Sequence, residues 1–152
     1  MNRIDLLIGS IMICLLSLYS CQNAKSTPAE NTQSQINVQI TCIERVIAKD
    51  GALGKIRNIA CKDIPLSQAI TNYTNAMGQL DYSGCPNSFK KAFIEHRNAW
   101  MGMTIVTDHY PDLRGDMHTL FDSLAKGEHA SQFKYHLQGI WDTWEAVESA
   151  SK

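Results

Sequence analysis

Apolar residues recur at steps of three and four along most of the chain, and this period limits the fold more than any other feature of the sequence. One clear series consists of Leu66, Ala69, Ile70, Tyr73, Met77 and Leu80. That spacing places the side chains on one face of an amphipathic helix. Similar series predict further helices over about residues 87–109, 113–125 and 130–149. The sequence therefore predicts an all-α fold, a small helical bundle of four or five helices.

Residues that begin or end helices separate these series. Pro65 lies at the first turn of the 66–80 helix, where its missing N–H costs nothing. Pro111 ends the second helix, because the residue before a proline avoids the helical region. Gly127 ends the third. On the last helix we expect the inward side chains to be Phe133, Leu137, Ile140, Trp141, Trp144 and Val147.

The segment from Ile36 to Cys61 fits two patterns. Isoleucines at steps of three and four fit a helix, whereas apolar residues at every second position fit a strand. Asp50-Gly51 would suit the turn of a β-hairpin. We expect a helix, because everything after it is helical and an isolated two-stranded hairpin is only marginally stable.

The N-terminus has a short, positively charged start, Met1-Asn2-Arg3, and then an apolar run of 13 residues from Leu6 to Leu18. A helix needs about 20 residues to cross the hydrocarbon core of a bilayer. The shorter run with a basic start is typical of a secretory signal, and an uncleaved anchor helix is the alternative.

The run ends in Leu18-Tyr19-Ser20-Cys21, which resembles the lipobox of bacterial lipoproteins. The resemblance to bacterial lipoproteins implies that residues 1–20 are a lipoprotein signal peptide, cut before Cys21. It implies that the Cys21 sulfur carries diacylglycerol and its amino group a further acyl chain, which together give a stable membrane anchor. Gln22 in place of aspartate implies the outer membrane, facing the periplasm. The expected location is therefore the bacterial cell envelope, outside the cytoplasm.

Residues 22–35 contain no large apolar side chain. Such a segment buries too little surface to offset its ordering entropy. We therefore expect the lipidated Cys21 and residues up to 35 to form a flexible tether, and residues 36–152 to form the helical domain.

Three cysteines remain after the anchor: Cys42, Cys61 and Cys85. Disulfides persist outside the cytoplasm, so one bridge and one free thiol are expected. A turn near Gly51 and Gly54 would bring Cys42 level with Cys61, whereas one long arm would bring Cys42 level with Cys85. The two glycines favour the turn, and hence a Cys42–Cys61 bridge with Cys85 unpaired.

Two histidines fall on apolar helix faces. His96 lies among the apolar positions of the second predicted helix, and His136 among those of the last. Inward histidines on different helices are candidate ligands for a haem or a divalent metal. The structural alternative, which we favour, is that each ring bonds a neighbouring carboxylate or backbone carbonyl, and no cofactor is predicted.

The segment 108–118 (DHYPDLRGDMH) is the densest polar stretch and joins two predicted helices. Connecting segments on a rigid scaffold often carry function. Its candidate ligand-binding residues are Asp108, His109, Tyr110, Arg114 and His118. The alternative is a well-capped turn between two helices, in which Arg114 pairs with Asp112 or Asp116, because helix ends attract the same residue types.

The chain has 14 basic and 15 acidic residues, a balance that argues against a nucleic-acid partner. It contains none of the common catalytic or nucleotide-binding motifs. The sequence therefore predicts a non-enzymatic binding or interaction module, whose partner is an envelope protein or a small molecule. The alternatives are a haem or metal protein using His96 and His136, and a hydrolase using paired acids.

Overall fold

The computed structural model describes residues 28–152, and the predicted signal peptide, Cys21 and residues 22–27 lie outside that range. Within it the chain forms α-helices and no strand, so the predicted all-α bundle is confirmed. The helices are α1 (Pro28–Ala60), α2 (Leu66–Met77), α3 (Asn87–Gly102), α4 (Thr104–Thr107), α5 (Met117–Leu124) and α6 (Ala130–Ala150). No helix of this part of the chain combines the length and apolarity needed to cross a bilayer.

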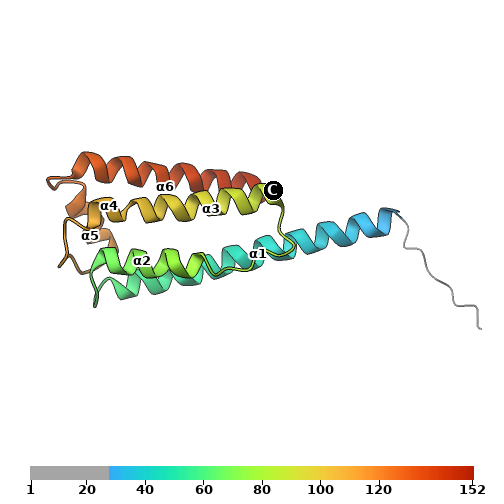
Figure 1. Cartoon of the computed structure of the whole chain (residues 1–152), viewed down its shortest axis with the longest axis horizontal. Coiled ribbons are helices and arrows are strands. Elements are labelled where there is room, and N and C mark those ends of the chain that lie inside the picture. The colour runs from blue at the N-terminus through green and yellow to red at the C-terminus, as the bar shows by residue number, and fades with distance from the viewer. Residues whose placement is uncertain (1–27) are drawn as a thin grey trace, which may run out of the picture.

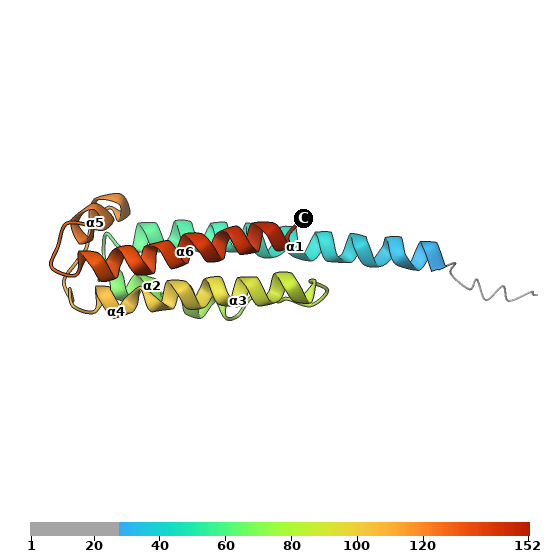
Figure 2. The same ribbon diagram turned by 90° about the horizontal axis from the view of Figure 1, so that it is seen from above.

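The four long helices run antiparallel in sequence order and stand at the corners of a bundle (Figures 1 and 2). α1 packs closely against α2, α2 against α3, and α3 against α6. The single turn α4 continues α3, and α5 covers the end of the bundle opposite the projecting start of α1 (Figure 1). The fourth side of the bundle, between α1 and α6, is the one that holds the site described below.

The buried faces match the period of the sequence. On α2 they include Leu66, Ile70 and Met77, and the predicted apolar positions of the second helix are all buried. Trp141 departs from the prediction, because its side chain is 57% exposed on α6. The third predicted helix begins later than expected, at Met117, since Asp116 caps it by accepting a hydrogen bond from the His118 backbone N–H at 3.0 Å.

α1 is one continuous helix of 33 residues, so the expected turn near Gly51 and Gly54 is wrong. A glycine in a helix interior costs about 1 kcal/mol relative to alanine, and burial of the Cys42 and Val46 face against α2 outweighs it. α1 also begins at Pro28, inside the segment expected to be a tether. Its first turns project beyond the other helices, and residues 30–41 are exposed (Figure 1).

The disulfide joins Cys42 to Cys85, so the favoured Cys42–Cys61 pairing is wrong. Cys42 lies within α1 and Cys61 directly follows its last residue, so the two are about 28 Å apart at 1.5 Å per residue, far beyond the reach of a bridge. α2 runs back along α1, and the 78–86 connection returns the chain to the level of Cys42. Cys61 is the free thiol; it is buried and lies 2.9 Å from the Arg57 carbonyl oxygen.

Candidate functional site

A cavity of about 340 Å³ lies between α1 and α6. Residues of α2 and α3 form its floor, and residues of α5 close one end. Its size falls within the range of small-molecule sites, and its wall is mainly aromatic and aliphatic with a few polar groups. The lining residues are Asp50, Gly51, Gly54, Arg57, Asn58, Tyr73, His96, Trp100, Met117, His118, Phe121, Leu137, Ile140, Trp141 and Trp144.

Two glycines of α1 keep this side of the bundle open. A Cβ atom added to Gly51 would meet nothing within 4 Å, and one added to Gly54 would meet only Arg57 Nη2, at 3.9 Å. Close helix packing therefore does not require glycine at either position. Their effect is to leave space on the face of α1 that looks across the cavity toward α6.

Asp50 and Tyr73 form the first polar contact of the cavity. The Tyr73 hydroxyl donates a hydrogen bond of 2.7 Å to Asp50 Oδ1. Burial raises the pKa of Asp50, and the hydrogen bond from Tyr73 and the charge of Arg57 act against that rise. Burial and the nearby Asp50 carboxylate also raise the pKa of Tyr73, so its hydroxyl stays protonated and donates.

Arg57 lies two turns after Asp50 on the same face of α1. Its guanidinium carbon is 3.8 Å from the centre of the Trp100 ring and 4.5 Å from that of Tyr73. These two rings meet edge to face and form a corner that holds the cation by cation–π attraction. Arg57 Nε and Nη2 donate to Asn58 Oδ1, and the Arg57 side chain also forms a hydrogen bond with that of Tyr73. Burial lowers the pKa of Arg57, although an arginine remains charged.

His96 contributes a neutral ring to the floor of the cavity. Its side chain is 4% exposed, and burial lowers its pKa to about 4. Nδ1 lies 3.1 Å from Thr143 Oγ1, whose own proton is directed to carbonyl oxygens of α6. The hydroxyl oxygen therefore accepts from Nδ1–H, and Nε2 is the unprotonated nitrogen. The Trp144 ring packs against His96 at 5.2 Å.

Of the candidate ligand-binding residues in the polar segment 108–118, His118 reaches the cavity and the other four do not. Arg114 forms an exposed ion pair with Asp112 at 3.6 Å, the helix-end arrangement considered from the sequence. His109 stacks on His129 with ring centres 4.0 Å apart, and Tyr110 meets the same ring edge to face. Asp108 caps the end of α4. The segment is therefore divided between the cavity and the end of the bundle.

The two candidate metal ligands line different hollows. His96 faces the cavity between α1 and α6, whereas His136 lines a groove between α3 and α6. There His136 packs on Gly102, and a Cβ atom added to that glycine would lie 3.2 Å from His136 Nδ1. The His96 ring forms a hydrogen bond with the Thr143 hydroxyl. Within residues 28–152 no three His, Cys, Asp or Glu side chains lie close enough together to hold a metal ion.

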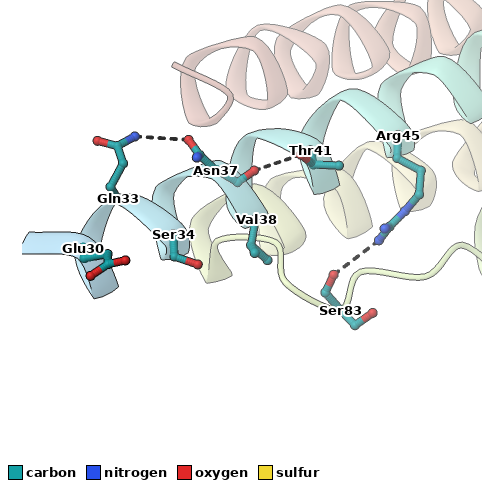
Figure 3. A pocket seen from close by; sticks show the side chains of 8 residues that line it. All are labelled: Glu30, Gln33, Ser34, Asn37, Val38, Thr41, Arg45 and Ser83. Carbon is teal, nitrogen blue, oxygen red and sulfur yellow. Dashed lines mark hydrogen bonds between the residues drawn. The ribbon is translucent and has the colours of Figure 1, made fainter. Parts of the chain in front are cut away.

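A second hollow runs along the projecting part of α1 (Figure 3). Its walls are side chains of a single helix face, joined only by Ser83 from the 78–86 connection. The polar groups bond one another: Gln33 donates to Asn37, Thr41 to the Asn37 carbonyl, and Arg45 to the Ser83 carbonyl. Because these groups already have partners, this surface is a weaker site candidate than the cavity.

The sequence analysis did not single out Asp50 or Arg57. Their signal is present, since Asp50, Gly54 and Arg57 follow a helical step of four and three in line with buried Cys61. Polar and small residues on the inward face of a helix mark a cavity or a functional group there. Asp50-Gly51 also has the composition of a turn, and that interpretation concealed the pattern.

Comparison of the chain with models of known protein families, with curated proteins and with solved structures finds no match.

Proposed function

We propose that this chain is a lipid-anchored protein of the bacterial cell envelope whose helical domain binds a small molecule without catalysing a reaction. The observation that carries the proposal is the cavity between α1 and α6, with a mainly apolar wall and the polar groups of Asp50 and Arg57. This combination, an apolar enclosure with few oriented polar groups, is typical of ligand sites.

The polar groups support recognition more than catalysis. Arg57 is held by two aromatic rings and Asp50 by the Tyr73 hydroxyl, so both are fixed before a ligand arrives. A general base works best when its pKa lies near the working pH. The pKa of His96, about 4, keeps that ring neutral at pH 7 and suits a hydrogen-bonding role.

The proposed anchor and α1 together favour a ligand taken from the periplasm. α1 begins seven residues after Cys21, and the cavity lies between Asp50 and Asn58 on the same helix. At 1.5 Å per residue, Asp50 stands about 33 Å along α1 from Pro28. A helix of that length would hold the cavity away from an outer membrane to which Cys21 is attached.

The binding function is tested by thermal unfolding of the mature lipoprotein in detergent with a panel of free amino acids, sugars, nucleosides and carboxylic acids. We expect at least one compound to raise the Tm of the wild type and not of Gly54→Leu, in which the new side chain fills the cavity. Gly139→Leu is the matched control, because a Cβ at Gly139 also meets nothing within 4 Å and that residue lies outside the cavity. A shift that survives Gly54→Leu, or no shift with any compound, contradicts the proposal.

The anchor is tested separately by labelling cells with a radioactive fatty acid. We expect label in the wild type and none in Cys21→Ala, which should persist as an uncleaved precursor. A mature, labelled protein from the variant would show that Cys21 is not the lipidated residue.

A further inference from the structure

We infer that the ligand of the cavity is a small zwitterion, a free α-amino acid with an apolar or aromatic side chain. The inference rests on the proposed binding function and adds the chemical class of the ligand. It is carried by two opposite charges that line one mainly apolar cavity, Asp50 and Arg57.

The geometry of α1 and α2 places the two charges on either side of one ring. The hydroxyl of Tyr73 reaches Asp50, and the face of the same ring carries the Arg57 guanidinium. Tyr73 donates to Asp50 Oδ1 and not to Oδ2, while Arg57 is hydrogen-bonded to Asn58 Oδ1 and to the Tyr73 side chain. A carboxylate and an ammonium attached to the same carbon of one ligand can meet these two charges together, the carboxylate at Arg57 and the ammonium at Asp50.

The charge balance of the cavity favours a zwitterion over an ion of one sign. Asp50 and Arg57 attract one another through space, while Tyr73 bonds the carboxylate and the guanidinium bonds both Asn58 and Tyr73. A lone anion would bind Arg57 and be repelled by Asp50, and a lone cation would meet the reverse arrangement. An α-amino acid satisfies both groups and adds no net charge to a partly buried site, where an uncompensated charge is costly.

Volume and wall chemistry limit the rest of the ligand. A cavity of about 340 Å³ lies within the size range of small-molecule sites, and it can accommodate an amino acid such as leucine or phenylalanine. Most of the remaining wall is aromatic or aliphatic, as at Trp100, Phe121, Trp144 and Ile140, which suits an apolar or aromatic side chain.

The decisive experiment compares matched ligands by calorimetry on the wild-type mature lipoprotein. L-phenylalanine should bind; 3-phenylpropionate, which lacks the ammonium, and phenethylamine, which lacks the carboxylate, should each bind at least about tenfold more weakly, because a buried charge is then left unpaired. Equal binding of either analogue overturns the zwitterion assignment while leaving the binding function intact. If no amino acid binds but a sugar or nucleoside does, the ligand class is wrong. If nothing binds, both proposals fail.

Variants assign the two ends of the ligand. Arg57→Gln should remove most of the preference for phenylalanine over phenethylamine, and Asp50→Asn most of the preference over 3-phenylpropionate. Arg114→Gln and Asp122→Asn, exposed and outside the cavity, are the controls and should bind like the wild type. Circular dichroism verifies that each variant is folded, and if one is not, the ligand comparison on the wild type still decides. Folded variants that keep both preferences would overturn the assignment of these residues.

Discussion

Cys42 and Cys85 form a disulfide with Cα atoms 5.2 Å apart, which ties α1 to the connection just before α3. The bridge spans 43 residues and encloses the whole of α2. Arg45 lies next to it and donates hydrogen bonds to the carbonyl oxygens of Asp81 and Ser83, so the connection is held to α1 at several points. The base of the projecting helix is therefore fixed to the bundle.

Loss of the disulfide should lower the free energy of unfolding by about 4 kcal/mol, because closing a loop of this length restricts the unfolded chain. Urea unfolding of Cys42→Ser/Cys85→Ser against the wild type measures the effect. Cys61→Ser, which removes the free thiol, keeps the bridge and is the control. Peptide mapping without reductant should yield a Cys42–Cys85 peptide, and a Cys42–Cys61 peptide would contradict the structure.

Two tyrosine-to-phenylalanine changes should have different effects. Tyr73→Phe removes the donor to the buried Asp50 and should cost about 1–3 kcal/mol. The Tyr110 hydroxyl is buried with no hydrogen-bond partner among the residues that the structure describes. Tyr110→Phe should therefore be neutral or stabilising. Denaturant midpoints of the two variants measure the contrast, and an equal loss in both would show that the Asp50 bond contributes nothing specific.

Stability should fall in acid through His96. Its pKa is about 4 in the folded chain and 6.5 ordinarily, so the unfolded state binds the proton first as the pH drops. The contribution of the neutral His96 ring to the free energy of unfolding is fully present above pH 6.5 and is lost between about pH 6.5 and 4. It amounts to about 3 kcal/mol, at 1.36 kcal/mol per pKa unit.

His96→Gln should remove that part of the pH dependence of unfolding. Burial raises the pKa of Asp50, so protonation of this residue stabilises the folded chain as the pH falls. Because Asp50 is present in both proteins, the difference in free energy of unfolding between His96→Gln and the wild type reports the histidine. Thr143→Val keeps the imidazole and should keep the slope. An unchanged slope in His96→Gln would rule out a buried neutral ring.

Two glycine-to-alanine changes test the backbone. Gly51→Ala should stabilise the protein by about 0.5–1 kcal/mol, because the residue is helical and the new Cβ meets nothing within 4 Å. Gly84→Ala should cost about 1–2 kcal/mol or more, since φ is +83° and the Cβ would lie 2.8 Å from Val38 Cγ1. Thermal unfolding measures both effects. A lower Tm for Gly51→Ala than for the wild type would mean that other atoms already occupy the space beside Gly51.

The helices were predictable because their signals are local. The apolar period of residues 66–80 and 130–149 specifies which faces are buried, and Pro65 and Gly127 mark ends near those observed. Only the exposed Trp141 departs from the inward set of α6, because it stands at the cavity, where no helix covers it.

The sequence suggested two of the polar residues that line the cavity. It predicted His96 on an apolar helix face, and that residue is buried. It named His118 within the polar segment 108–118, most of which lies away from the cavity. Asp50 and Arg57 were not recognised, since a helix passing through Gly51 and Gly54 is stabilised by packing against α2 and not by local propensity.

By itself the sequence determined the helical class, the buried faces and the resemblance of residues 18–21 to a lipobox, because each depends on residues close together in the chain. Only the tertiary structure decided the Cys42–Cys85 pairing and the meeting of Asp50, Tyr73 and Arg57. Both depend on how α2 aligns against α1 after a turn many residues away. That alignment is set by the packing of whole helix faces, which no local pattern contains.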